Sequence, residues 1–166
     1  VLTQRDALGH VTTFVYDDEL RTVTVTTPEG IASVTVSNRH GETASRTDGL
    51  GSVTRYEYDR SGRLVKTATP LASETTTYDD AGRVASTRDA NGTVVAYTYD
   101  AVDRVKTRTV DPDGLALQTS YAYDGRDVRV TDPLGVVTLT RYDRKGRVAT
   151  QVVDEGDPPE MLEVQL

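Results

Sequence analysis

Hydrophobic and polar residues alternate along most of the chain in short runs that turn-forming residues separate. The clearest example lies between Asp48 and Thr69, where the runs 53–58 and 63–69 are rich in Val, Thr and Tyr. A period of two in residues of this kind predicts β-strands. Asp59 and Gly62 bracket the connection, because Asp bonds the backbone two residues on and Gly adopts the left-handed conformation that closes a short loop. This stretch therefore predicts a β-hairpin.

The hairpin pattern recurs with a nearly fixed period. Successive Tyr-Asp pairs, with Ser37-Asn38 filling one vacant slot, are 21, 21, 20, 21, 24 and 19 residues apart. Gly62, Gly82 and Gly146 each close a Tyr-Asp-x-x-Gly turn, whereas the turns after Asp17, Asp100 and Asp124 lack Gly at that place. We expect the pairs to mark the corners of successive hairpins; they are Tyr16-Asp17, Tyr58-Asp59, Tyr78-Asp79, Tyr99-Asp100, Tyr123-Asp124 and Tyr142-Asp143.

A second series of turns lies half a period away. Its members start with Asp or Pro and end with Gly, as in Asp48-Gly-Leu-Gly51 and Asp132-Pro-Leu-Gly135. Gly9, Gly51, Gly92 and Gly135 each precede the next Tyr-Asp aspartate by eight residues, so the intervening strands have one length. A fixed period near twenty residues indicates a repeat architecture in which each unit needs its neighbours.

The recurring Tyr-Asp-x-x-Gly-Arg at 58–63, 78–83 and 142–147, with Gly-x-x-Thr-x-Tyr-x-Tyr-Asp before it, closely resembles the YD repeat. This repeat occurs in bacterial Rhs (rearrangement hotspot) proteins, toxin-complex proteins, wall-associated proteins and teneurins. The resemblance covers roughly residues 1–154. It implies a sheet that winds into a hollow β-shell around a C-terminal toxin domain.

The pattern and the resemblance together predict an all-β fold of tandem antiparallel hairpins, without helix. Residues 1–154 form an array of about seven units, the first truncated, and we expect about fourteen strands. Accumulating twist should bend so long a ribbon into a curved, open spiral sheet, a fragment of a β-shell. Residues 155–166 form either an acidic, Pro-containing tail or the start of a further repeat.

Composition narrows the possible partners. The net charge is −7, which disfavours nucleic acid, and no apolar run is long enough to span a membrane. With one Phe, no Trp and one Met, the chain lacks the residues of an ordinary core, so cross-strand pairs must supply much of the stability. Residues 1–10 lack the form of a signal peptide.

The residues offer little that would support catalysis or a cofactor. Asp132-Pro-Leu-Gly135 resembles the place where Rhs proteins cleave themselves, but Pro presets a turn and an ordinary strand follows. Acidic groups such as Asp79-Asp80 lack the spacing of known calcium loops, and His10 and His40 each stand alone beside a turn glycine. We therefore predict no enzyme activity, no cofactor and no metal site.

The nine tyrosines admit two interpretations. They either pack across strands and stiffen the sheet, which we favour, or form an aromatic stripe that binds glycans. The leading hypothesis is accordingly a non-catalytic structural segment of a β-shell that encapsulates and helps deliver a toxin, secreted or at the cell surface. The alternative is a cell-surface adhesin or carbohydrate-binding module. Expected partners are the neighbouring repeats and an enclosed toxin domain, and edge-to-edge self-association is expected of a fragment with open strand edges.

Overall fold

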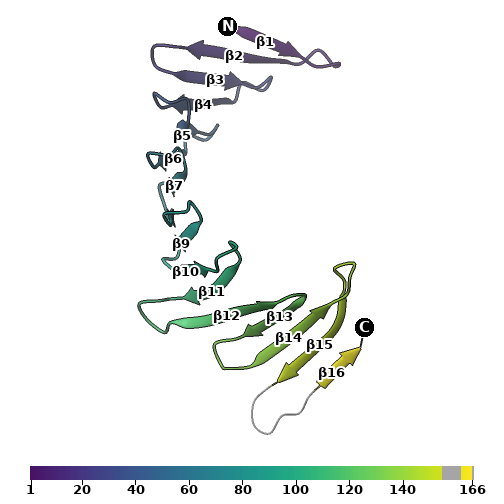
Figure 1. Ribbon diagram of the computed structural model, residues 1–166. Coiled ribbons are helices and arrows are strands. Elements are labelled where there is room, and N and C mark those ends of the chain that lie inside the picture. Colours follow the sequence, from purple (N-terminus) through teal and green to yellow (C-terminus); the bar gives the residue numbers. More distant parts are fainter. Residues whose placement is uncertain (155–161, 166) are drawn as a thin grey trace. The chain divides into compact units, whose positions relative to one another are not determined.

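The computed structural model describes residues 1–154 and 162–165, and all of its regular secondary structure there is β-strand (Figure 1). The strands are β1 (Leu2–Arg5), β2 (Val11–Asp17), β3 (Thr22–Thr26), β4 (Ala32–Ser37), β5 (Thr43–Thr47), β6 (Val53–Tyr58), β7 (Leu64–Ala68), β8 (Ser73–Tyr78), β9 (Val84–Arg88), β10 (Val94–Tyr99), β11 (Val105–Val110), β12 (Leu117–Asp124), β13 (Asp127–Thr131), β14 (Val137–Tyr142), β15 (Val148–Asp154) and β16 (Leu162–Gln165).

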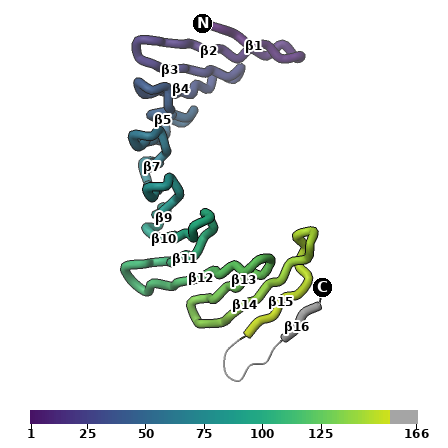
Figure 2. The backbone as a smooth tube through the Cα atoms, viewed as in Figure 1, coloured from purple at the N-terminus to yellow at the C-terminus, as the bar shows by residue number. Residues whose placement is uncertain are grey.

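The strands follow one another in a single sheet in chain order, from β1 to β16. Each recorded pairing is antiparallel and joins strands that are consecutive in sequence, as the path of the tube in Figure 2 shows. The prediction of an all-β array of tandem hairpins is therefore confirmed. Sixteen strands replace the expected fourteen, because β1 and β16 flank the seven predicted hairpins. The curvature of the sheet stays a prediction.

The chain divides into two units. The first contains Val1–Thr76 with Asp89–Gly92, and the second contains Thr77–Arg88 with Thr93–Leu166. The prediction for the tail concerns residues 155–166, of which 155–161 and 166 lie outside the described residues; β16 pairs with β15.

Four strand pairs carry a bulge at the same place in the repeat. The register shifts between Val36 and Ser37, Glu57 and Tyr58, Thr98 and Tyr99, and Arg141 and Tyr142. In each case the shift falls at the residue that precedes the turn aspartate or asparagine. A bulge adds one residue to one strand and strengthens the local twist, so it aims the turn relative to the sheet.

Cross-strand pairing assigns the tyrosines to one face within each unit. In the second unit, Tyr97 pairs with Arg108 and Tyr121 with Val130, while the opposite face carries Thr98, whose hydroxyl lies 2.6 Å from that of Thr107. In the first unit, Tyr56 pairs with Thr67, and Tyr16 pairs with Val23. Residues directly opposite each other point to the same side, so the tyrosines of each unit share one face of the sheet.

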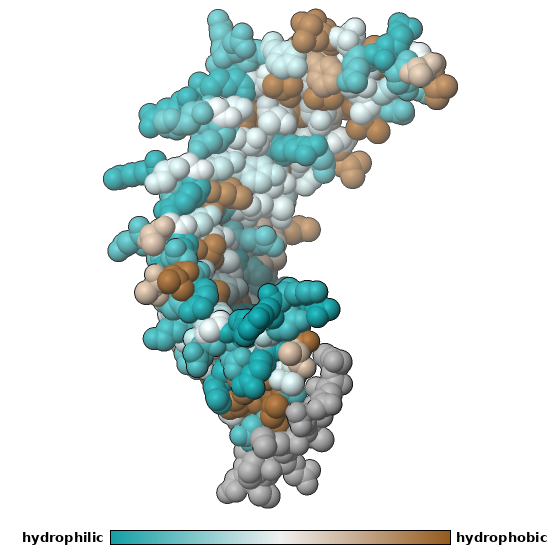
Figure 3. Space-filling view, turned by 45° about the vertical axis from the view of Figure 1, so that its right-hand side comes forward, coloured by the Kyte–Doolittle hydropathy of each residue, from teal (hydrophilic) through white to brown (hydrophobic). Residues whose placement is uncertain are grey.

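The sheet is a single layer without a hydrophobic core. Among the described residues no hydrophobic side chain is buried, and Thr140, 9 % exposed, is the one buried polar residue. Hydrophobic and hydrophilic side chains are interspersed on the surface in view in Figure 3. The fold therefore depends on ladder hydrogen bonds, cross-strand pairs and the turns at the strand ends.

Candidate functional site

The Tyr-Asp turns all lie at one edge of the strand ladder in the order of the topology. Each turn follows an even-numbered strand and leads into the next odd-numbered strand, so the second series of turns lies at the other edge. The two series of turns therefore lie at opposite ends of the strands and give the sheet two chemically different borders. We call the border that carries the Tyr-Asp turns the YD edge.

An aspartate holds each regular turn at the YD edge through both carboxylate oxygens. The N–H groups of Ser61 and Arg63 donate to Oδ1 of Asp59 at 2.9 and 3.0 Å, and the N–H of Gly62 donates to the carbonyl of Asp59 at 3.1 Å. Gly62 has a φ of 77°, the left-handed conformation predicted from the sequence. Asp79, Asp100 and Asp143 accept the same pair of N–H bonds in their own turns.

The arginine that follows the turn binds the remaining carboxylate oxygen. Nε of Arg63 donates to Oδ2 of Asp59 at 2.7 Å, and the bonds that begin at Arg83, Arg104 and Arg147 measure 2.8, 2.7 and 2.8 Å. In Asp59 and Asp143 the backbone N–H of this arginine is the main cause that lowers the carboxyl pKa, and in Asp79 it is the guanidinium of Arg83. In Asp100 desolvation is the largest single cause and acts to raise the pKa, but the hydrogen bonds from Arg104 and Val102 together lower it.

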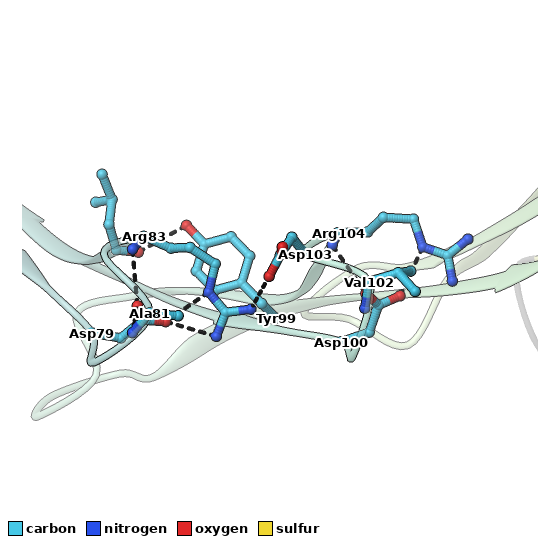
Figure 4. Close-up of polar contacts among 9 residues, drawn as sticks. Asp79, Ala81, Arg83, Tyr99, Asp100, Val102, Asp103 and Arg104 are labelled. Carbon is cyan, nitrogen blue, oxygen red and sulfur yellow. Dashed lines mark hydrogen bonds and ion pairs between the residues drawn. The ribbon is translucent and has the colours of Figure 1, made fainter.

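Arg83 also joins its repeat to the next one. Its guanidinium carbon lies 4.5 Å from the centroid of the Tyr99 ring, and its Nη1 binds Oδ1 of Asp103 in the following turn (Figure 4). The hydroxyl of Tyr99 donates to the carbonyl of Val84 at 2.8 Å. One arginine therefore contacts its own aspartate, the next tyrosine and the next turn. Asp79 first and Asp103 second raise the pKa of Arg83.

The same arrangement recurs one repeat later. Arg104 lies 4.2 Å from the centroid of the Tyr123 ring, whose hydroxyl donates to the carbonyl of Val105 at 2.9 Å. In both places an arginine stacks on the tyrosine of the next repeat, and the tyrosine hydroxyl donates to the backbone carbonyl of the residue that follows the arginine. We call this pair of contacts the Arg–Tyr clamp. It fastens neighbouring hairpins at the YD edge by contacts that backbone ladders do not provide.

Three turns depart from the regular pattern in instructive ways. Asn38 takes the place of the turn aspartate, and Glu42 takes the place of the arginine four residues later. The amide Nδ2 of Asn38 donates to Oε2 of Glu42 at 2.7 Å, so the first residue is the donor here and the acceptor in the regular turns. Asp103 stands for glycine yet keeps the turn, with a φ of 65°. Asp124 pairs directly with Asp127 around a two-residue loop, and Arg141 binds Asp127 at 3.0 Å instead.

The remaining members of the predicted set occupy the same border. Tyr16 is 52 % exposed on β2, and Asp17 accepts the N–H of Leu20 at 2.9 Å. Tyr142 ends β14, and Gly146 has a φ of 77°. The motif arginine belongs to this site as well, although it is not among the residues predicted to mark the corners. The signal for it in the sequence is an Arg that recurs four residues after Asp17, Asp59, Asp79, Asp100 and Asp143.

The second series of turns uses the aspartate but not the arginine. Asp6, Asp48 and Asp132 accept N–H bonds from the residues two and four positions on. This engagement accounts for Asp132 in the Asp-Pro-Leu-Gly stretch as a turn residue. His10, which stands alone beside a turn glycine in the sequence, is exposed and binds Asp6 at 2.9 Å.

Leucines at the tips of this second series are almost fully exposed. Leu8, Leu50 and Leu134 occupy the same position in their turns, donate the same N–H bond to the turn aspartate, and are 82 %, 96 % and 88 % exposed. The corresponding tips at the YD edge are mostly polar or small, such as Ser61, Ala81 and Lys145. We call this border the leucine edge.

The geometry at the YD edge suits the fastening of neighbouring repeats to one another. The carboxylates are engaged by N–H groups and guanidinium groups, and within 1–154 no three His, Asp or Glu residues form a cluster that could hold a metal ion. No described helix is long and apolar enough to cross a membrane.

Comparisons with known proteins agree with this architecture. The family model described as RHS Repeat matches residues 38–74 and 78–116. The crystal structures of TcdB2-TccC3-TEV and of TcdB2-TccC3 without its hypervariable C-terminal region superpose on the chain with TM-scores of 0.74 and 0.73. Each is 17 % identical and is matched over 99 % of this chain, which spans only 10 % of that chain. No curated protein matches by sequence.

Proposed function

Because this chain belongs to the Rhs (YD) repeat family, we propose that it is a non-catalytic wall segment of a larger hollow β-shell. In this proposal the shell encloses a C-terminal toxin domain and helps deliver it. The protein would act outside the cell or at its surface. Its partners are the neighbouring repeats of the same polypeptide and the enclosed domain.

The observation that carries the proposal is a single-layered sheet whose cohesion lies at its turns. Without a core, each hairpin gains its order from the hairpins beside it, as in other repeat proteins. The Arg–Tyr clamp strengthens this dependence at the YD edge. Such a sheet can be extended by adding repeats, which a wall requires and a compact binding domain does not.

The leucine edge supports the view that more protein lies against this segment. Single exposed leucines are common, but Leu8, Leu50 and Leu134 occupy one turn position, and each is more than four-fifths exposed. Their identical N–H bonds hold the tips in one conformation. A border of this kind is expected to be covered in the assembled protein, and the matched toxin-complex chains, of which this chain spans 10 %, show how much more polypeptide such a fold can contain.

A glycan-binding role has less support from the geometry. The aromatic faces resemble platforms on which sugars stack, and Tyr16 is about half exposed. The rings and hydroxyls of Tyr99 and Tyr123 are already engaged in clamps, however, so they are not available as a sugar platform. We therefore keep glycan binding as the outcome that would replace the shell proposal.

The test uses the complete natural polypeptide that contains these residues. We expect the domain after the repeats to resist limited proteolysis and to be inactive while the repeats are intact. The double variant Arg83→Ala/Arg104→Ala should make that domain sensitive to protease, whereas Arg144→Ala, which removes an exposed turn arginine, should leave it protected. Equal protease sensitivity in all three proteins, together with retention on a glycan array, would reject the shell in favour of the adhesin.

A further inference from the structure

The YD edge contains a hollow where one repeat lacks its tyrosine. Ser37 occupies the tyrosine position, and two hollows of about 910 and 350 Å³ flank it within the first unit. Arg21, Ser37, Asn38 and Arg39 line both of them. Their location at the serine suggests that the missing side chain is the reason for the space.

The regular repeats show which group would fill this space. Arg21 precedes Ser37 by sixteen residues, as Arg83 precedes Tyr99. Around Arg83 the space is taken by the Tyr99 ring, 4.5 Å from the guanidinium. At Ser37 no ring is present, and Nε of Arg21 instead donates to the carbonyl of Ser37 at 3.2 Å. The hollow therefore lies where a tyrosine ring lies in the regular repeats.

The walls of the larger hollow are themselves suited to an aromatic ring. Tyr56 and Tyr58 line it from β6, and Ala44 lines it from β5. Aromatic rings pack edge-to-face or offset against one another at low entropic cost, since their side chains have few rotatable bonds. The volume of about 910 Å³ lies within the range of about 300 to 1,000 Å³ typical of ligand sites and exceeds what one ring needs. Residues on either side of a bound ring would therefore also fit.

The charges around the hollow favour an anionic ligand. Arg21, Arg39 and Arg60 line it, and none of them has a carboxylate partner among the described residues. Asp59, which also lines the hollow, is already paired with Arg63 at 2.7 Å. Glu42 is the remaining carboxylate and accepts a hydrogen bond from Asn38. At the larger hollow, arginines without an ion pair thus outnumber carboxylates without one, on a chain whose net charge is −7, while Asp17 and Asp18 line the smaller hollow.

We propose that this hollow binds the side chain of a tyrosine flanked by acidic residues, presented by an extended peptide segment. The ring takes the place of the missing tyrosine between Arg21 and Tyr58, and the flanking carboxylates face Arg39 and Arg60. A neutral sugar would also meet the aromatic walls, but it would leave the excess of arginines without a role. The inference does not depend on the proposed shell, because it concerns the local geometry of one repeat.

The experiment is an NMR titration of the ¹⁵N-labelled 166-residue chain with the peptide Ac-Asp-Tyr-Asp-NH₂. We expect saturable shifts of the amides of Ser37, Asn38, Ala44 and Tyr58. Ac-Asp-Leu-Asp-NH₂ and Ac-Lys-Tyr-Lys-NH₂ should each bind more weakly, because the first lacks the ring and the second carries the wrong charge. Equal shifts with all three peptides, or tighter binding of an N-acetylglucosamine trisaccharide, would overturn the proposal.

Two sets of variants locate the binding. Ser37→Tyr fills the hollow and should weaken peptide binding by about tenfold or more. Ser37→Ala leaves the hollow open and should change the affinity for the peptide by no more than about twofold. Arg39→Glu and Arg60→Glu change exposed turn residues, keep the fold intact and should each weaken binding by about two- to fivefold. Undiminished binding to Ser37→Tyr with a native spectrum, or to both charge-reversed variants, would contradict the assignment.

Discussion

Replacing Tyr99 by Phe removes one hydrogen bond of the Arg–Tyr clamp and keeps the aromatic ring. The hydroxyl donates to the carbonyl of Val84 at 2.8 Å in a half-buried setting. A bond of this kind contributes about 0.5–1.5 kcal/mol to stability. Because the ring stays over Arg83, the stacking contact survives the change. We therefore expect the loss of about 1 kcal/mol in the free energy of unfolding, equivalent to about 2–4 °C in Tm for a chain of this size.

Tyr97 provides the matched control on the same strand and face. Tyr97 lies opposite Arg108 in the strand register, and no hydrogen bond involves its hydroxyl among the described residues. Tyr97→Phe should therefore leave stability unchanged, while Tyr123→Phe should repeat the loss because its hydroxyl binds the carbonyl of Val105. The two clamps involve different arginines, so the double variant Tyr99→Phe/Tyr123→Phe should lose about the sum, 2 kcal/mol.

The assay is urea unfolding followed by circular dichroism, together with hydrogen exchange of the amides near the clamps. Hydrogen exchange is needed because repeat arrays open locally, and a single midpoint does not describe them fully. We expect faster exchange around Val84 in Tyr99→Phe and around Val105 in Tyr123→Phe. The clamp would be refuted by equal effects of Tyr97→Phe and Tyr99→Phe, or by faster exchange spread evenly over the chain.

Three further predictions follow from the turns. Gly82→Val should cost about 1–2 kcal/mol because Gly82 has a φ of 84°, whereas Ala81→Val should be nearly neutral in urea unfolding; equal losses would contradict the turn assignment. In the folded chain the pKa values of four turn aspartates lie below the ordinary value of 3.8; these are Asp59, Asp79, Asp100 and Asp143. Their contribution to folding stability is therefore present above pH 3.8 and is lost as the pH falls through the lowered pKa values. The urea midpoint should accordingly fall between pH 5 and about 3, and a rise would refute the reasoning. Serine at the exposed leucine tips should change the stability of the isolated chain by no more than about 0.5 kcal/mol, because the side chains are exposed; the variants are Leu8→Ser, Leu50→Ser and Leu134→Ser. The same variants should lower the thermal stability of the complete polypeptide. A large loss of stability in the isolated chain would show that the tips are already packed.

Much of the fold could be read from the sequence, since its decisive interactions are local. The bonds from Asp59 to Ser61 and Arg63 span two and four residues, and the left-handed φ of Gly62 is a property of one residue. Alternation along 53–58 likewise assigns Tyr56 and Tyr58 to one face without reference to other strands. Turn chemistry repeated at a fixed period was sufficient to predict successive antiparallel hairpins.

The contacts between repeats could not be read in this way. Arg83 meets Tyr99 and Asp103, sixteen and twenty residues further on, and only the register of β9 with β10 and the turn after β10 bring them together. Asp103 also depends on a contact between repeats. It adopts a left-handed conformation at a turn position that favours glycine, and its carboxylate accepts a hydrogen bond from Arg83 of the preceding turn. The hollow at Ser37 is likewise a property of two neighbouring repeats.

The sequence by itself determined the turns, the strands and their order, because these depend on dihedral preferences and hydrogen bonds that reach only a few residues. Tertiary structure decided which side chains from successive repeats meet, where a missing ring leaves space, and which turns carry exposed leucines. The physical reason is that an open sheet without a core places its specific contacts at the strand ends, where small shifts of register and bulges such as that at Tyr99 choose the neighbours.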